Sequence, residues 1–104
     1  MSANQVFERG DRVGIYLQDK HSLEENVELV QYAEEQGIDE IWQAESRLAR
    51  DAVSPLGAYA AVTDDIKLGT GVINNWTRNA ALIAQSMSTL EELAGPDRIM
   101  CRIG

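Results

Sequence analysis

The stretch KLGTGVINNWTR, residues 67–78, begins as a β-strand but carries two glycines inside it. Val72 and Ile73 are β-branched residues of the kind that strands prefer. Glycine inside a strand weakens it and often marks a place where a ligand or another backbone comes close. Gly69 and Gly71 therefore predict an open cleft beside the strand, a helix packed tightly over it, or a bulge.

Strand and helix patterns alternate along the rest of the chain. Short β-branched and aromatic runs predict four strands with three helices between them, the strands at residues 12–17, 38–44, 66–73 and 98–103. Ser22 followed by Glu25 is a capping-box pattern, and Gly37 stands where a helix-ending glycine is expected. Ser54 and Pro55 predict the start of the second helix.

This alternation predicts an α/β fold with a parallel sheet, because a parallel neighbour needs a long return connection that a helix supplies. Two architectures fit four such units: an open flavodoxin-like sheet, or the N-terminal half of an eight-stranded TIM (β/α)8 barrel. In both, ligands bind at the carboxyl ends of the strands. The residues expected on that rim are Gln18, Glu45, Asn74, Asn75 and Gly104.

Composition narrows the classes of function. With 104 residues, 44% of them apolar, the chain is long enough for one domain, residues 1–104. Its 17 acidic and 9 basic residues give a net charge of −8, which disfavours nucleic-acid binding because phosphates require a basic face. The acidity indicates a solvated surface or adaptation to high salt. No apolar run approaches the roughly 18 residues of a membrane helix, so we expect a cytoplasmic protein that does not bind membranes.

The residue inventory also excludes several kinds of site. His21 and Cys101 are the only histidine and cysteine, so the chain cannot assemble a zinc cluster or a complete Cys/His or Ser/His/Asp set, and we expect no metal site. The segment GTGVIN has Asn74 where a dinucleotide-binding loop would have its third glycine.

Glu45 is the candidate catalytic residue, since it ends the otherwise apolar strand of IWQAES at the position where such folds present reactive side chains. The structural alternative is an ion pair with Arg47 or Arg50. Trp42 and Trp76 are open to two interpretations, as packing residues or as platforms for a ligand.

The run IKLGTGVINNWTRNAALIAQSMSTLEELAGPDRIMCRIG, preceded by AEEQGIDEIWQAES, resembles the bacterial-luciferase-like oxidoreductases. Within them it is most similar to the deazaflavin-dependent methylenetetrahydromethanopterin reductases of archaea. The resemblance implies that the chain is the N-terminal half of a TIM barrel, a fold for which about 250 residues is typical. It also implies a non-prolyl cis peptide bond at Gly71–Val72, forming a bulge behind the middle ring of the cofactor.

The resemblance further implies coenzyme F420, a deazaflavin, as the cofactor, with FMN as the alternative. It implies that Glu45 lies near the reacting face of the cofactor and that Asn74 contacts its ring or polar edge. Gly71, Val72 and Gly104 complete the expected cofactor-binding set. Many relatives have histidine where this chain has Ser46, and His-Pro where it has residues 79–80, which leaves the proton donor and the substrate class open.

The expected function is hydride transfer between coenzyme F420 and a small organic substrate, for which a one-carbon pterin carrier is a candidate. The alternatives are an FMN-dependent luciferase-like monooxygenase and a non-catalytic α/β binding module. A half barrel has two open edge strands and an uncovered inner face. We therefore expect a homo-oligomer, and we expect the 104-residue chain alone to associate and to be inactive.

Overall fold

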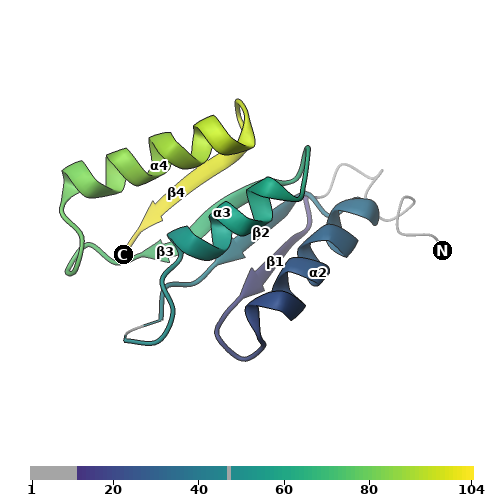
Figure 1. The fold of residues 1–104 in the computed structure, drawn as a ribbon, viewed down its shortest axis with the longest axis horizontal. Coiled ribbons are helices and arrows are strands. Elements are labelled where there is room, and N and C mark those ends of the chain that lie inside the picture. The colour runs from purple at the N-terminus through teal and green to yellow at the C-terminus, as the bar shows by residue number, and fades with distance from the viewer. Residues whose placement is uncertain (1–11, 47) are drawn as a thin grey trace.

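In the computed structural model, which describes residues 12–46 and 48–104, four strands alternate with three helices (Figure 1). The strands are β1 (Gly14–Leu17), β2 (Glu40–Gln43), β3 (Lys67–Ile73) and β4 (Ile99–Ile103). The helices are α2 (Leu23–Glu35), α3 (Val53–Ala61) and α4 (Ala80–Ala94). All four predicted strands are confirmed, each slightly shorter than predicted.

The strands form one parallel sheet in the order β1-β2-β3-β4, and the three helices all cover the same face of it (Figure 1). A flavodoxin-like sheet would carry helices on both faces and a strand order that reverses at a switch point. Sequential strands with helices on one side are the arrangement of a (β/α) barrel. The fold is therefore α/β and corresponds to part of a TIM barrel, and the open-sheet alternative is wrong.

The helix ends show which local signals the chain uses. The Ser22 hydroxyl accepts a hydrogen bond from the Glu25 amide at 3.1 Å, as the capping-box pattern predicts, and Gly37 has a φ of +83°. The second helix begins earlier than the predicted start at Ser54 and Pro55, because α3 already begins at Val53. The Asp51 carboxylate, rather than the Ser54 hydroxyl, accepts a hydrogen bond from an amide of the first turn, that of Ser54, at 2.9 Å. Within the described residues, no helix has both the length and the apolar character needed to span a membrane.

The hydrophobic core lies between the helices and one face of the sheet. Side chains alternate between the two faces of a strand, so Ile41 and Gln43 point into this core and Trp42 points to the opposite, inner face. Gln43 is fully buried but satisfied, because it accepts a hydrogen bond from the Tyr59 hydroxyl at 2.6 Å. The core consists of Leu17, Val30, Ala33, Ile41, Leu56, Tyr59, Ala60, Ile66, Leu68, Leu90 and Ala94.

At the amino ends of the strands, buried Arg98 joins α3, α4 and the loop before β3. Its guanidinium donates to the carbonyl oxygens of Ile66 at 3.0 Å and Ala94 at 2.8 Å, and to the Thr63 hydroxyl at 2.6 Å. The Glu34 carboxylate accepts hydrogen bonds from three consecutive backbone amides of the same loop. This end of a barrel contributes stability, so the reactive groups are to be sought at the other end.

Candidate active site at the carboxyl ends of the strands

Glu45 lies just beyond the carboxyl end of β2, where its carboxylate joins three segments of the rim. It accepts hydrogen bonds from the amide of Ala52 at 3.0 Å, at the start of α3, and from the amide of Asn74 at 2.9 Å, just after β3. The Arg78 Nη2 donates to the same carboxylate at 2.9 Å. Glu45 thus holds the two rim loops against each other.

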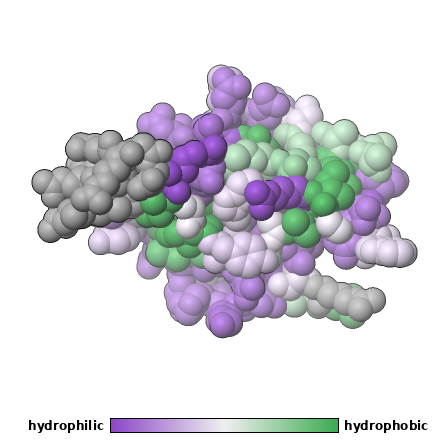
Figure 2. Space-filling view, turned by 180° about the vertical axis from the view of Figure 1, so that it is seen from behind, coloured by the Kyte–Doolittle hydropathy of each residue, from purple (hydrophilic) through white to green (hydrophobic). Residues whose placement is uncertain are grey.

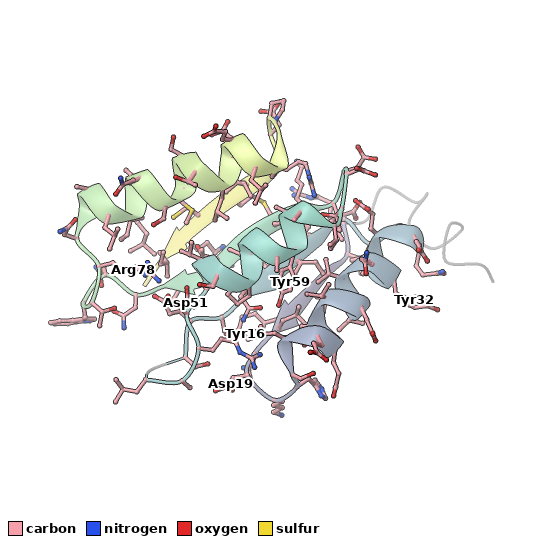
Figure 3. The ribbon with its side chains drawn as sticks, in the orientation of Figure 1. Tyr16, Asp19, Tyr32, Asp51, Tyr59 and Arg78 are labelled. Carbon is pink, nitrogen blue, oxygen red and sulfur yellow. The ribbon has the colours of Figure 1, made fainter. Side chains whose placement is uncertain are left out.

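The Glu45–Arg78 pair is largely withdrawn from solvent, with the side chains only 8% and 16% exposed. Burial raises the pKa of Glu45, but the hydrogen bonds from Arg78, Asn74 and Ala52 outweigh it, so the pKa lies below its ordinary value of 4.5. The Asp51 carboxylate lies 3.6 Å from the Arg78 Nη2, and the two residues lie close together in Figure 3. The site therefore holds Glu45 as a carboxylate anion with its oxygens already engaged.

The ion pair differs from the one considered from the sequence. Arg47 lies outside the described residues, and Arg50 donates to the carbonyl oxygen of Gln18 at 3.3 Å. The partner of Glu45 is instead Arg78, which was not among the arginines considered from the sequence. The role of Glu45 in catalysis stays a prediction, and the geometry favours positioning over proton transfer.

The third strand carries the expected bulge. The Gly71–Val72 peptide bond is cis, and the β3–β4 register breaks between Thr70 and Ile73. The hydroxyl of Thr70 bridges the break by accepting from the Arg102 amide at 2.8 Å and donating to the Arg102 carbonyl oxygen at 2.9 Å. The backbone at the carboxyl end of β3 is therefore displaced from the regular ladder yet fully tied to β4.

Aromatic side chains on the inner face of the sheet lie beside the two glycines. Figure 2 shows this face, where patches of hydrophobic residues lie between near-neutral and hydrophilic ones. A Cβ at Gly69 would lie 2.6 Å from the indole of Trp42, so this tryptophan fills the place that a flat ligand ring was expected to share. A Cβ at Gly71 would lie 3.2 Å from the Trp42 Cβ and 3.3 Å from the ring of Tyr16. Trp42 is a packing residue, and the expectation of open space at Gly69 is wrong.

Gly69→Ala should therefore destabilise the protein by about 1 to 3 kcal/mol, because the added methyl group overpacks against Trp42. Gly57→Ala is the matched control. Gly57 lies inside α3, and a Cβ there would lie 3.9 Å from the Leu90 side chain, which is an ordinary contact. Since alanine is favoured over glycine within a helix, this substitution should stabilise the protein by about 0.5 to 1 kcal/mol. Thermal unfolding of the two variants measures the difference. Equal melting temperatures would contradict close packing at Gly69.

The other predicted residues line the rim around the bulge. Val72 is 40% exposed, and a Cβ at Gly104 would lie only 2.7 Å from the Val72 Cγ2 methyl group, so the Gly104 backbone packs closely against the Val72 side chain. The Asn74 side chain accepts a hydrogen bond from the Trp76 amide at 2.7 Å and so shapes the loop after β3. The structure brings Gly71, Val72, Asn74 and Gly104 to one edge of the sheet. Their part in cofactor binding remains a prediction.

A sequence profile described as luciferase-like monooxygenase matches residues 7–104. The chain belongs to this family. Over 68 residues it is 46% identical to a 5,10-methylenetetrahydromethanopterin reductase of Methanolobus tindarius, a match covering 65% of this chain and 21% of that protein. The chain therefore spans only a minor part of the length of this relative.

Two solved structures share the fold. The coenzyme F420 dependent tetrahydromethanopterin reductase of Methanopyrus kandleri superposes with a TM-score of 0.82 at 27% identity, over 89% of this chain and 26% of that one. Monooxygenase RslO1 of Streptomyces bottropensis gives a TM-score of 0.81 at 23% identity, over 90% and 33% of the two chains. The latter likeness concerns the fold alone.

On the rim of this luciferase-like segment, the loops after β2 and β3 enclose an open cleft of about 1070 Å³. The Glu45–Arg78 pair lies in its lining, and Trp76, which is 91% exposed, borders it. Trp76 therefore differs from Trp42, since it packs against little and presents its ring to solvent at the end of the barrel where this family's ligands are expected.

Proposed function

We propose that this segment belongs to a longer (β/α) barrel protein, and that this full-length protein is an oxidoreductase that transfers a hydride between coenzyme F420 and a small organic substrate. The observation that carries the proposal is the register break of β3 at the carboxyl end of the sheet, bordered by Val72 and Gly104. The 46% identity to a methylenetetrahydromethanopterin reductase supports a one-carbon pterin carrier as a candidate substrate.

The residues around the bulge fit a flat cofactor ring. Tyr16 is 55% exposed and Val72 40% exposed on either side of Gly71, so an apolar surface is available there, whereas Trp42 closes the space nearer Gly69. Gly71, Val72 and Gly104 would hold the ring, and Asn74 would meet its polar edge. When bound, the deazaflavin accepts or gives the hydride, which protein side chains cannot do.

The chain's own residues bind, orient and shield. Glu45, fixed as an anion by Arg78, holds the loop that carries Asn74 and thereby orients the polar edge of the site. Thr70 keeps the bulge attached to β4. Tyr16 and Trp42, the aromatic residues beside Gly71 on the inner face, would exclude water from a ring held there.

An FMN-dependent monooxygenase is the second candidate, because the family profile is that of a luciferase-like monooxygenase. Titration of the full-length protein with coenzyme F420 and with FMN, each followed by absorbance, separates the two. We expect tighter binding of coenzyme F420. Tighter binding of FMN would favour the second candidate, and binding of neither would favour a non-catalytic α/β module.

Expressed alone, the 104-residue segment is expected to dimerise or aggregate and to show no oxidoreductase activity. Edge strands β1 and β4 keep unpaired backbone groups, and Tyr16 and Val72 are exposed on the inner face. Size-exclusion chromatography with light scattering, followed by coenzyme titration, tests this. A stable monomer that binds coenzyme F420 and turns over substrate would contradict it. We also propose that the full-length protein is a cytoplasmic homo-oligomer.

A further inference from the structure

Arg102 lies on the inner face of β4, directly beside the bulge of β3. Its amide donates to the Thr70 hydroxyl, so the backbone at this residue is fixed to the bulge. Its guanidinium carbon lies 4.6 Å from the centroid of the Trp42 ring, within the range of a cation–π interaction. The indole in turn packs closely against Gly69, so the arginine lies over a ring that is itself packed on the sheet.

The positive charge of Arg102 has no acidic partner among residues 12–46 and 48–104. Glu40, which accepts a hydrogen bond from the Trp42 indole at 3.4 Å, is paired with Arg12 instead. In the same ranges the Arg102 guanidinium makes no hydrogen bond, although it carries five donors in a planar fork. A guanidinium that is held in place and has no acidic partner within these ranges can receive an anion.

We propose that Arg102 binds the carboxylate of a small organic acid that is the substrate of the proposed oxidoreductase. The inference rests on the proposed function, because the bulge beside Arg102 is where the cofactor ring would lie. A planar fork matches a planar carboxylate through two parallel hydrogen bonds. In TIM barrels, phosphate groups frequently bind at the loops after strands seven and eight, away from β4. The site therefore selects acids over neutral alcohols of similar shape.

The test compares an aromatic acid with its neutral analogue. Benzoate and benzyl alcohol are titrated calorimetrically into the full-length protein, with and without bound coenzyme. Benzoate should bind more tightly than benzyl alcohol by on the order of tenfold or more, since the free energy of a hydrogen bond between charged groups corresponds to an affinity ratio of that size. Arg102→Leu should remove this preference while leaving benzyl alcohol binding unchanged, and Arg102→Lys should retain part of it.

Lys67→Met is the matched control, because it removes the same charge from an exposed position at the amino end of β3. It should leave benzoate binding unchanged. Equal affinities for the two probes, absence of benzoate binding at millimolar concentration, or a normal preference in Arg102→Leu would each overturn the proposal. Thermal unfolding of every variant verifies that the fold is retained.

The titrations also separate this proposal from the proposed function. Coenzyme affinity should change less than about threefold in Arg102→Leu, because the arginine is assigned to the substrate. A loss of coenzyme affinity with unchanged benzoate binding would assign Arg102 to the cofactor ring and overturn the substrate proposal. If the wild type binds benzoate through Arg102 but neither coenzyme, the acid site stands and the proposed function fails.

Discussion

Arg98→Leu is expected to destabilise the full-length protein by about 4 kcal/mol, because it removes the shared donor of several buried carbonyl groups. Leucine leaves the carbonyl oxygens of Thr63, Ile66 and Ala94 without their donor in a region where Arg98 itself is only 7% exposed. A buried polar group that loses its partner costs about 1 to 3 kcal/mol. Since whole domains are stable by about 5 to 15 kcal/mol, folding itself is at risk.

Arg12→Leu is the matched control for this prediction. Arg12 forms an ion pair with Glu40, but its side chain is 64% exposed, and exposed pairs contribute about 0 to 1 kcal/mol. Urea denaturation of both variants gives the two free energies of unfolding. A loss of less than about 1 kcal/mol in Arg98→Leu would mean that water or a shifted loop satisfies the carbonyl groups equally well.

The strands and their order were predictable because the signals are local. Each strand is a short β-branched run, the connections are helical, and sequential winding then gives the observed order. The Ser22 cap was predictable for the same reason, since donor and acceptor are three residues apart. The start of α3 was misjudged because Asp51, not Ser54, provides the oxygen that accepts the first-turn amide.

The partners of the glycines were not predictable, because they depend on the register between strands. Trp42 lies opposite Gly69 only because β2 and β3 pair in that register, and one residue of slippage would turn the indole toward the helices. The glycine pattern alone is equally compatible with a ligand, a helix or a bulge. In the structure, Gly71 lies in a bulge of β3, and Gly69 makes room for the aromatic side chain of Trp42.

The role of Glu45 was only half predictable. Its place at the carboxyl end of β2 follows from the strand pattern, but its partner Arg78 lies 33 residues further along the chain, and no local rule pairs them. Sequence analysis offered the nearer arginines instead. The distinction matters for mechanism, since a carboxylate held by Arg78 and two backbone amides is poorly suited to exchange protons.

Glu45→Gln should therefore weaken coenzyme binding by the full-length protein rather than remove a proton-transfer step. The NH2 group of the glutamine can only donate, so it would face the N–H groups of Arg78 and Ala52 without forming a hydrogen bond. The loop that carries Asn74, which Glu45 holds in place, would then be released. Removing one member of a buried ion pair costs about 3 to 5 kcal/mol, and part of this loss should appear as a coenzyme affinity lower by about tenfold or more.

Arg78→Leu distinguishes positioning from proton transfer, because it breaks the same contact without altering the carboxyl group. Both variants should lose coenzyme affinity similarly, and the double variant should lose little more, as coupled residues do. Glu25→Gln, at a carboxylate 65% exposed on α2, is the control and should have no effect. If Glu45→Gln lowers kcat with unchanged coenzyme affinity while Arg78→Leu does not, Glu45 is a proton carrier and the positioning role is wrong.

The pH dependence of stability gives an independent measurement of the same contact. The pKa of Glu45 is lower in the folded protein than its ordinary value of 4.5, so the unfolded chain takes up a proton at a higher pH than the folded one does. The stabilisation is therefore complete above pH 4.5 and is lost as the pH falls through the folded-state pKa. Glu34, whose pKa is lowered too, acts in the same direction. Unfolding free energies measured between pH 7 and pH 3 should fall less steeply in Glu45→Gln than in the wild type, and identical slopes would show that Glu45 is not held as an anion.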